Sequence, residues 1–514
     1  MKRWSALALL LSLAAALALR VPNLDIRPLH NDEAVNAVKV IELWQQGRYA
    51  YDPDEYHGPT LHYATLPFLW LSGARNSDEL DDATLRLAPV LFGVGLILLP
   101  LLLADGLGRH AVAWAAIFTA ISPAMVFYSR YFIHEMLLLF FTALTLGAGW
   151  RYAQTRSARW AVLTGTGLGL MFTTKETFVI SVAAMGLAAI ATVRRTVPKS
   201  TGVQSLLALW NWKHAALALS ATFIIWLLLF SSFFTHVAGL LDSVRAYLPW
   251  LKRAGGHSPH IHPWSFYLQR LAWFHPAKGP VWSEGLILIL AAVGVVVAFV
   301  GKKSPLRPFL ALYTIILTVI YSAISYKTPW CLLSFFHGMV LLAGVGAASL
   351  LEFFRARPLK VVVVTALIGF TAQLSWQAWR ASFVYPADRR NPYVYAQTVP
   401  DLLNLVQRTE DLARVAPAGY ETIVKIIATD SDYWPLPWYL RRFKHLGWYE
   451  KLPDDPFAPI VVVSSKLDAR LDDKSDRKWI MVGLTELRPG RFFEQYVELE
   501  LWKKYVETLP RERD

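Results

Sequence analysis

Long apolar runs recur through the first three quarters of the chain. Most are about 18 residues or longer, enough to cross a hydrocarbon core of about 30 Å as a helix. Lys175 and Glu176 divide one longer apolar stretch, and a single helix there would bury both charges, so the pattern predicts two helices joined by a tight turn. We expect about eleven transmembrane helices, at residues 4–20, 83–104, 110–129, 133–150, 160–173, 177–193, 214–233, 283–300, 308–325, 331–351 and 360–379.

The pattern changes after about residue 385. "TIVKIIATDSDYWPLPWYLRR" predicts a strand, a turn and a short helix, and "APIVVVSS" predicts a second, buried strand. "KWIMVGLTEL" and "QYVELELWKKYV" are typical of two more strands. The fold class predicted is therefore an α-helical polytopic membrane protein, residues 1–385, with a C-terminal extracytoplasmic α/β domain, residues 386–514.

The C-terminal domain shows neither a glycine-rich phosphate loop nor an obvious catalytic cluster, so we expect a binding or lid domain. "TDSDYWP", Thr429 to Pro435, places an acidic pair where a strand ends. Such a pair either faces a ligand or forms a solvated turn.

Charge gives the orientation. The net charge is +13, and the lysines and arginines concentrate in alternate loops, which is the positive-inside bias with a cytoplasmic N-terminus. The excess is thus a topology signal and no nucleic-acid footprint. We expect a multi-pass protein of the plasma (inner) membrane with large outer loops at 21–82 and 234–282. A cleaved signal peptide at the basic, apolar N-terminus stays an alternative.

The informative polar residues collect on the predicted outer side. This distribution predicts a site at the outer membrane–water boundary, whereas a transporter more often keeps its ionisable residues near the midplane. The single cysteine, Cys331, lies in an apolar segment and excludes a disulfide framework.

The first outer loop contains "HNDEA", with Asp32 and Glu33 at the start of a mostly apolar helical pattern over residues 34–44. Adjacent carboxylates at a membrane surface can act as a general base or hold a divalent cation. Acids in the first turn of a helix are also favoured by the helix dipole alone. The two explanations stay open at this point.

Further candidates occupy later outer segments. His57 and His62 lie either side of a Gly-Pro turn, and Arg130, His134 and Glu135 open a transmembrane segment, where acid and base could pair with each other.

Two lysines, Lys175 and Lys327, stand at outer helix ends, where they either snorkel or bind a phosphate head group. The loop after the seventh span holds His257, His260 and His262; an H-x-H pair can bind zinc, but no nearby acid or cysteine completes a site.

The order of these motifs resembles a known family. "NDEA", "YHGPTLHY", "YSRYFIHEMLLLFF" and "TTKETFV" follow one another as in membrane glycosyltransferases of the protein O-mannosyltransferase and lipid A aminoarabinose transferase type, which share the GT-C fold. The likeness covers about residues 1–180. "HNDEA", "YHGPTLHY", "TKE" and "NPYVYAQT" (Asn391 to Thr398) are also similar to a prokaryotic subgroup associated with flippase activity in archaeal N-glycosylation.

The resemblance implies roles for single residues. Asp32 matches the catalytic base, Glu33 its neighbour that holds the acceptor or a metal, and Glu135 the second acidic residue. The resemblance also implies that His57 and Lys175 lie near the donor phosphate and that Arg130 accompanies Glu135. With His62 and, from topology, Lys327 added, the residues predicted to bind substrate or lipid phosphate are His57, His62, Arg130, Lys175 and Lys327. Gly58 departs from the family pattern, which often has a second proline there, and His134 stands where an apolar residue is usual.

The function implied is an inverting, protein-glycosylation-type transfer of a hexosyl or mannosyl unit from a polyprenyl-phosphate donor to a glycan, lipid or protein acceptor on the extracytoplasmic face. Membrane lipids are the other expected partners, and no nucleic acid is expected. A divalent cation, Mg²⁺ or Mn²⁺, stays open, with Asp32, Glu33 and His134 as candidate ligands. The alternative function is a non-catalytic component associated with flipping of lipid-linked sugars.

Overall fold

The structure is a computed structural model that describes residues 3–55, 57–196, 211–250, 260–301 and 304–510. Contacts between residues divide the chain into two compact units. Unit 1 comprises Met1–Leu24, Glu42–Phe68 and Ala83–Tyr395, and unit 2 comprises Asp25–Ile41, Leu69–Asp82 and Ala396–Asp514. The domains expected from sequence, 1–385 and 386–514, separate a transmembrane part from a soluble part, and that division stays a prediction. The two units described here are defined by contacts between residues.

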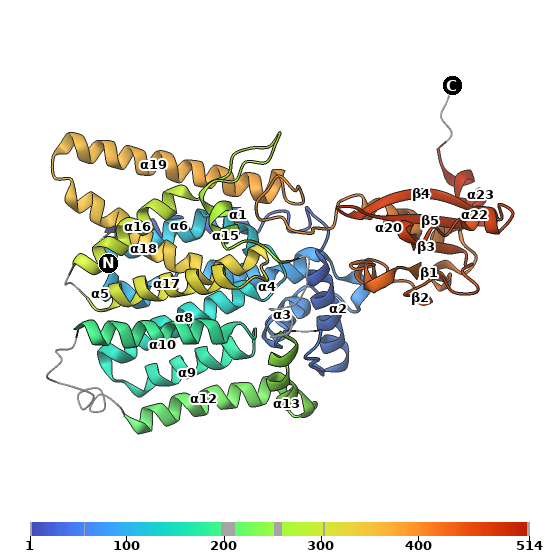
Figure 1. The fold of residues 1–514 in the computed structure, drawn as a ribbon. Helices are drawn as coiled ribbons and strands as arrows, with labels where there is room; N and C mark the ends of the chain where they lie inside the picture. The colour runs from blue at the N-terminus through green and yellow to red at the C-terminus, as the bar shows by residue number, and fades with distance from the viewer. Residues whose placement is uncertain (1–2, 56, 197–210, 251–259, 302–303, 511–514) are drawn as a thin grey trace. The chain divides into compact units, whose positions relative to one another are not determined.

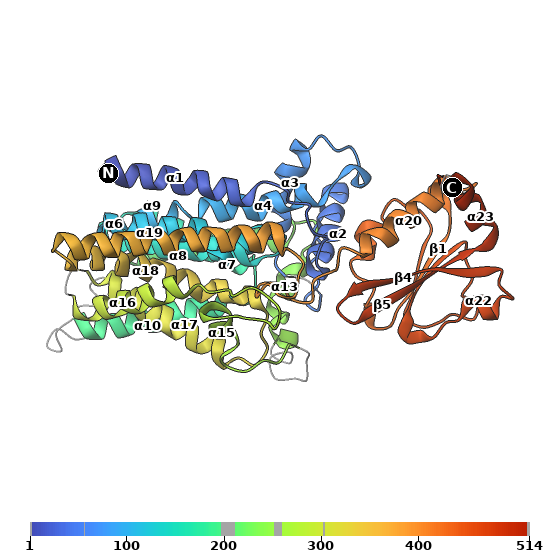
Figure 2. The same ribbon diagram turned by 90° about the horizontal axis from the view of Figure 1, so that it is seen from above.

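Unit 1 is a bundle of long helices that run side by side (Figures 1 and 2). Its principal helices are α1 (Arg3–Arg20), α4 (Asp82–Gly95), α6 (Arg109–Ile121), α7 (Pro123–Ser129), α8 (Glu135–Thr155), α9 (Ala158–Phe172), α10 (Phe178–Thr196), α12 (Trp212–Phe230), α16 (Gly285–Val300), α17 (Leu306–Ala323), α18 (Leu333–Phe353) and α19 (Arg357–Trp379). Shorter helices are α3 (Thr60–Leu71), α5 (Ala104–Leu107), α13 (Ala238–Arg245) and α15 (Phe266–Ala272).

Each expected apolar segment is helical, but the helices differ in length. Among the described residues, seven helices are long and apolar enough to cross a membrane. An eighth would be α6 with α7, which meet at a bend of 58° where Pro123 begins the second helix. Two apolar helices, Ser5–Arg20 and Gly285–Val300, are shorter, and α9 has 15 residues. A multi-pass helical membrane protein is supported, and the number eleven stays a prediction.

Small residues let two helices of unit 1 approach closely. A Cβ atom added to Gly294 of α16 would lie 2.1 Å from the carbonyl oxygen of Leu342 in α18. A Cβ added to Gly346 of α18 would lie 2.0 Å from the Leu290 oxygen of α16. Since apolar surface alone gives little drive for association in lipid, such close backbone packing holds membrane helices together.

Unit 2 contains a five-stranded sheet in the order β2-β1-β3-β5-β4. Strands β1 (Val424–Ile427), β2 (Leu446–Tyr449) and β3 (Ile460–Ser464) are parallel, and β4 (Trp479–Arg488) and β5 (Arg491–Glu498) continue the sheet in antiparallel pairing. Helices α20 (Leu402–Val415), α21 (Leu436–Tyr439) and α23 (Leu499–Thr508) contribute to the core on one face of the sheet. Leu471 of α22 (Leu471–Lys474) joins the core on the other face (Figure 2).

The sequence predicted β1, α21, β3 and β4, but it missed β2 and extended the last strand too far. Residues 499–508 form helix α23 instead. The alternating "ELEL" hides a helical spacing, because Leu501 is buried and Trp502 and Tyr505 pack beside it on the core.

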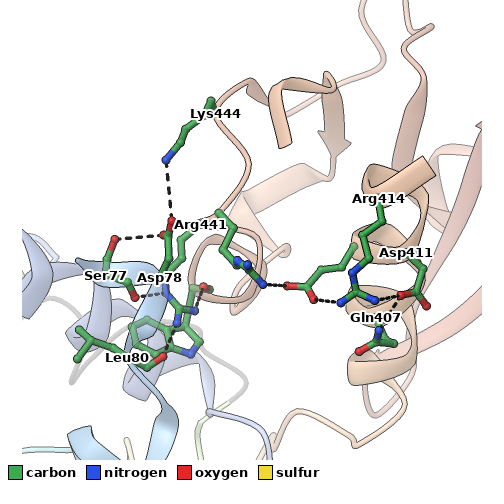
Figure 3. A network of polar contacts seen from close by, with 11 residues as sticks. Ser77, Asp78, Leu80, Gln407, Asp411, Arg414, Arg441 and Lys444 are labelled. Atoms are coloured by element: carbon green, nitrogen blue, oxygen red, sulfur yellow. Dashed lines mark hydrogen bonds and ion pairs between the residues drawn. The ribbon is translucent and has the colours of Figure 1, made fainter. Parts of the chain in front are cut away.

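Two N-terminal segments fold with unit 2. Residues 77–80, in the second of these segments, contact two cations of the C-terminal part. The Arg441 guanidinium donates to the carbonyl oxygens of Ser77 (2.9 Å) and Leu80 (2.5 Å), and Lys444 lies 4.0 Å from Asp78 (Figure 3). The same network continues from Arg442 through Glu410 (3.5 Å) to helix α20. These contacts explain why this part of the first outer loop groups with the C-terminal residues.

Candidate active site

Helix α2 (Asn31–Gln46) begins inside unit 2 with a reciprocal capping arrangement. The Asp32 backbone N–H donates to Nδ1 of His30 (3.1 Å), and the His30 backbone N–H donates to the Glu33 carboxylate (2.9 Å). The arrangement resembles a capping box, in which the side chains of the N-cap residue, here His30, and of the third helical residue, here Glu33, satisfy backbone amides at the helix start. His30 and Glu33 therefore both serve the helix start.

The two neighbouring carboxylates have different surroundings. Glu33 is fully buried and lies 3.7 Å from the guanidinium of Arg27. The Asp32 side chain is 47% exposed, and its oxygen lies 3.8 Å from His30 Nδ1. Glu33 is engaged by the fold, whereas Asp32 presents an accessible carboxylate, as a general base requires.

Burial also acts on His30. It lowers the pKa of the imidazole, and the nearby Asp32 and Glu33 carboxylates oppose part of that shift. A neutral ring is what the helix start needs, because Nδ1 accepts the Asp32 N–H. No sequence pattern had indicated this role of His30.

Residues from the C-terminal part of unit 2 bond to the segment that leads into α2, residues 28–31. The Tyr439 hydroxyl accepts the Leu29 N–H (2.7 Å), and the Gln397 side chain donates to the Pro28 carbonyl (2.9 Å). Arg488 donates to the Asn31 side chain at 3.4 Å. The domain expected to be a lid or binding module thus supports the residues around Asp32, which only the fold could reveal.

Unit 1 holds a second group of candidates around the break between α9 and α10. The Lys175 ammonium pairs with the Glu135 carboxylate at the first turn of α8, and both side chains are nearly buried. Next to Lys175, the Glu176 carboxylate bonds to His57 Nδ1 (2.8 Å) and accepts the Tyr51 hydroxyl (3.1 Å). The predicted pairing of an acid and a base occurs here, but it joins Glu135 to Lys175 and leaves Arg130 aside.

The turn after His57 fits against this break because residue 58 is glycine. A Cβ there would lie 2.1 Å from the Thr173 carbonyl oxygen. Thr60 then donates its N–H to the same oxygen (3.1 Å), and His134 Nε2 lies 3.1 Å from the Gly58 carbonyl. The departure from the family pattern at Gly58 therefore has a packing reason.

The histidines of this region gather as rings. The centroids of His57 and His134 lie 5.2 Å apart, those of His62 and His134 5.5 Å apart, and His57 stacks on Trp250 at 4.9 Å. His57, His62, His134, Glu135 and Lys175 are thus brought together in unit 1.

Arg130 and Lys327 do different work from that expected. The Arg130 guanidinium donates to the carbonyl oxygens of Arg20, Pro22 and Asn23 at 2.7–2.9 Å, which satisfies the end of α1. The Lys327 ammonium donates to the Ile324 carbonyl at the end of α17 and to that of His262 (3.2 Å). Both cations cap helix ends, and phosphate binding by them stays a prediction.

The His-rich loop has a partner that the sequence analysis missed. His260 Nδ1 and His262 Nε2 lie 2.8 Å and 2.9 Å from the Tyr395 hydroxyl. His257 lies outside the described residues. Within the described part of the chain, no group of three or more His, Cys, Asp or Glu side chains is arranged to hold a metal ion. Metal binding by Asp32, Glu33 and His134 stays a prediction.

Glu284 is a further buried carboxylate that sequence reasoning missed. Its Oε1 accepts bonds from the Ser122 hydroxyl (3.0 Å), the Ala124 N–H (2.8 Å) and the Tyr393 hydroxyl (3.0 Å). The side chain is fully buried. Glu284 thus links the bend between α6 and α7 to the start of α16. The only sequence signal for it was an acidic residue two positions after Trp282, at the start of an apolar helix.

Comparison with known proteins agrees with the fold expected from the motifs. The model of the family "Dolichyl-phosphate-mannose-protein mannosyltransferase" matches residues 61–241, less than half of the chain. That stretch includes Glu135 and Lys175 and begins after Asp32. No curated protein matches the chain significantly.

Solved structures match nearly the whole chain. ArnT from Cupriavidus metallidurans bound to undecaprenyl phosphate is 17% identical, with a TM-score of 0.61 over 96% of this chain and 98% of that one. The apo form of ArnT gives 0.63 at 17% identity over 94% and 97%. AglB from Archaeoglobus fulgidus, in complex with an inhibitory peptide and a dolichol-phosphate, gives 0.59 at 13% identity over 91% and 70%. The expected GT-C fold is confirmed.

Proposed function

We propose that this chain is a membrane glycosyltransferase that takes a sugar from a polyprenyl-phosphate donor and transfers it to an acceptor on the extracytoplasmic face. The observation that supports this most is the contrast at the start of α2, where Glu33 is engaged by the fold and Asp32 remains accessible. A carboxylate left accessible beside a neutralised neighbour suits proton abstraction.

Asp32 removes the proton of an acceptor hydroxyl, and the acceptor oxygen attacks the anomeric carbon from the face opposite the leaving group. The bond between that carbon and the phosphate oxygen breaks, the lipid phosphate departs with the electron pair, and the configuration inverts. The proton ends on the Asp32 carboxyl. Cations near the departing phosphate lower the barrier by stabilising its growing charge.

The residues proposed for the donor phosphate are those of the cluster in unit 1. His57 is partly exposed, and its Nδ1 lies 2.8 Å from the Glu176 carboxylate, which holds the ring in place beside the cluster. Lys175 is nearly buried against Glu135 and must exchange that carboxylate for the phosphate to bind it. ArnT carries undecaprenyl phosphate and AglB a dolichol-phosphate in their structures, which supports a polyprenyl-phosphate ligand for this fold.

The finer assignments are proposals as well. A hexosyl or mannosyl donor is suggested by the family model that matches residues 61–241. We keep Mg²⁺ or Mn²⁺ as a proposed addition to the site, although no step above depends on it. The described residues include no group of three His, Cys, Asp or Glu side chains arranged to hold such an ion.

The test is a transfer assay with purified protein, labelled polyprenyl-phosphate sugars, and glycan, lipid and peptide acceptors. Wild type should transfer sugar and Asp32→Asn should not; an active Asp32→Asn would overturn the base assignment. A folded wild type that binds the donor but transfers nothing to any acceptor would instead support the non-catalytic, flipping-associated role.

Orientation needs its own experiment. A topology reporter fused to the C-terminus should report an extracytoplasmic location, and one fused to the N-terminus a cytoplasmic one. A cytoplasmic C-terminus would overturn the placement of Asp32 on the outer side, whatever the chemistry proves to be.

A further inference from the structure

Three cations of unit 2 meet at a single carboxylate. Asp432 accepts bonds from the Arg488 guanidinium through its side chain and its backbone carbonyl (3.0 Å for the latter). Arg491 Nε lies 3.1 Å and Lys466 Nζ 3.7 Å from the other carboxylate oxygen. The cations therefore outnumber the carboxylate they contact by two, so the group carries an excess of positive charge.

The cluster stands where open sheets bind ligands. Asp432 and Lys466 follow the carboxyl ends of the parallel strands β1 and β3, and Arg491 opens β5 beside the end of β3, since Ser464 pairs with Phe493. The crevice at the carboxyl ends of parallel strands is the usual ligand position in α/β sheets. Glu450, which follows β2, is engaged by the Ser431 N–H and hydroxyl (3.2 and 3.0 Å).

Exposure separates the anchoring groups from those that reach a ligand. The side chains of Asp432 and Arg488 are 19% and 16% exposed, whereas those of Arg491 and Lys466 are 44% and 45% exposed. Asp432 and Arg488 thus form the floor, and Arg491 and Lys466 present their charge to solvent. A guanidinium and an ammonium side by side match the oxygens of a phosphate group.

The floor of the cluster touches the start of α2. Arg488 bonds to Asn31, the residue before Asp32, at 3.4 Å. Burial lowers the pKa of Arg488, and the carboxylates of Asp432 and Asp32 oppose that shift, so Asp32 lies within electrostatic range. All of these residues belong to unit 2.

We propose that Arg488, Arg491 and Lys466 bind a phosphate group of the acceptor and so hold its hydroxyl near Asp32. This inference rests on the proposed function for the identity of the ligand as acceptor; the phosphate site itself stands on the geometry of unit 2.

The test measures binding, with no need for turnover. In the first arm, the full-length protein in neutral nanodiscs is titrated with inorganic phosphate. In the second arm, the wild-type protein is reconstituted in nanodiscs that contain phosphatidic acid. Protection of Arg491 and Lys466 from arginine- and lysine-directed reagents is then measured. Wild type should bind, and Lys466→Gln/Arg491→Gln should bind about a hundredfold more weakly, since each of the two lost charged hydrogen bonds weakens binding about tenfold. Half-exposed positions tolerate these changes, and thermal unfolding checks it.

The matched control is Lys503→Gln, which removes an exposed lysine of unit 2 that pairs with Glu500 at 2.8 Å. It should bind as wild type does. Binding of soluble phosphate indicates a phosphoryl group recognised wherever it is carried, and protection by phosphatidic acid alone indicates a lipid headgroup; both support the site.

The inference is overturned if wild type and the double variant bind inorganic phosphate equally, or neither binds it, and phosphatidic acid does not protect Arg491 and Lys466 of the wild type. The outcome is separable from the proposed function. Phosphate binding without any sugar transfer would leave the site standing and sink the transferase, and transfer that the double variant performs with unchanged acceptor KM would do the reverse.

Discussion

The two groups of candidate residues differ in how their charges are treated. In unit 1, Glu135 and Glu176 are buried against Lys175 and His57, so each carboxylate meets a base. In unit 2, the Asp32 carboxylate is about half exposed while its neighbour Glu33 is engaged by the helix start. Buried and neutralised charges mainly determine where helices sit, whereas an accessible carboxylate is available for proton transfer.

The largest effect expected is on catalysis, at Asp32. Asp32→Asn should lower kcat/KM by about a thousandfold, as loss of a general base does. The unfolding temperature should stay near that of wild type, because the Asp32 side chain is 47% exposed. Transfer assays and thermal unfolding in the same detergent check both. An unfolded Asp32→Asn would show that the residue belongs with the structural charges.

The next effect concerns the buried pair of unit 1. Lys175→Met should destabilise the protein by about 3 kcal/mol, because it leaves the Glu135 carboxylate buried beside an apolar side chain. Adding Glu135→Gln should recover most of that loss, which unfolding measurements on the single and double variants would reveal. Unchanged stability of Lys175→Met would argue that Lys175 serves a ligand and contributes little to the fold.

A smaller loss is expected at Glu33. Glu33→Gln keeps an acceptor for the His30 N–H but removes the negative charge that lies beside Arg27. The free energy of unfolding should fall by about 2 kcal/mol, because the charged interaction with the buried Arg27 is lost. Per folded molecule, sugar transfer should stay within severalfold of wild type. Inactivation as deep as that of Asp32→Asn, without loss of stability, would make Glu33 a second catalytic carboxylate.

The smallest effect is a pH dependence from His30. Burial lowers its pKa below the usual 6.5, so the native state binds fewer protons than the unfolded chain. Stability should therefore be full above about pH 6.5 and decline as the pH falls from there towards the lower, native pKa. His30→Asn keeps an acceptor that can cap α2 and should flatten this part of the unfolding-temperature profile; an unchanged slope would exclude His30 as its source.

Much of the fold could be read from local pattern. The long apolar runs became helices, and the short continuous apolar run in "APIVVVSS" became the buried strand β3, because each pattern depends on neighbours a few residues away. Strand β2 was missed because only four half-buried residues form it, and its place at the sheet edge depends on β1. Helix α23 was predicted as a strand because the short alternation of acidic and apolar residues at 498–501 is compatible with the periodicity of a strand and of a helix.

The candidate site was predictable in part for the same reason. "NDEA", "YHGPTLHY" and "TTKET" marked the segments that hold Asp32, His57 and Lys175, and the ordered motifs indicated the fold that ArnT and AglB share. The partners of those residues were not predictable, since Arg130 and Lys327 look like phosphate ligands until the helix ends they cap are known.

By itself, the sequence determined the helical character of unit 1, the presence of a C-terminal sheet and the identity of the residues that could do chemistry, because hydrophobic period and residue type are local properties. Only the tertiary structure decided which charges are neutralised and which remain accessible. Glu33 and Asp32 are adjacent in the chain, yet Arg27 and the His30 N–H engage Glu33. The flanking residues Leu29 and Asn31 are held by the distant Tyr439 and Arg488. Burial and pairing depend on contacts across hundreds of residues, and those arise only when the chain folds.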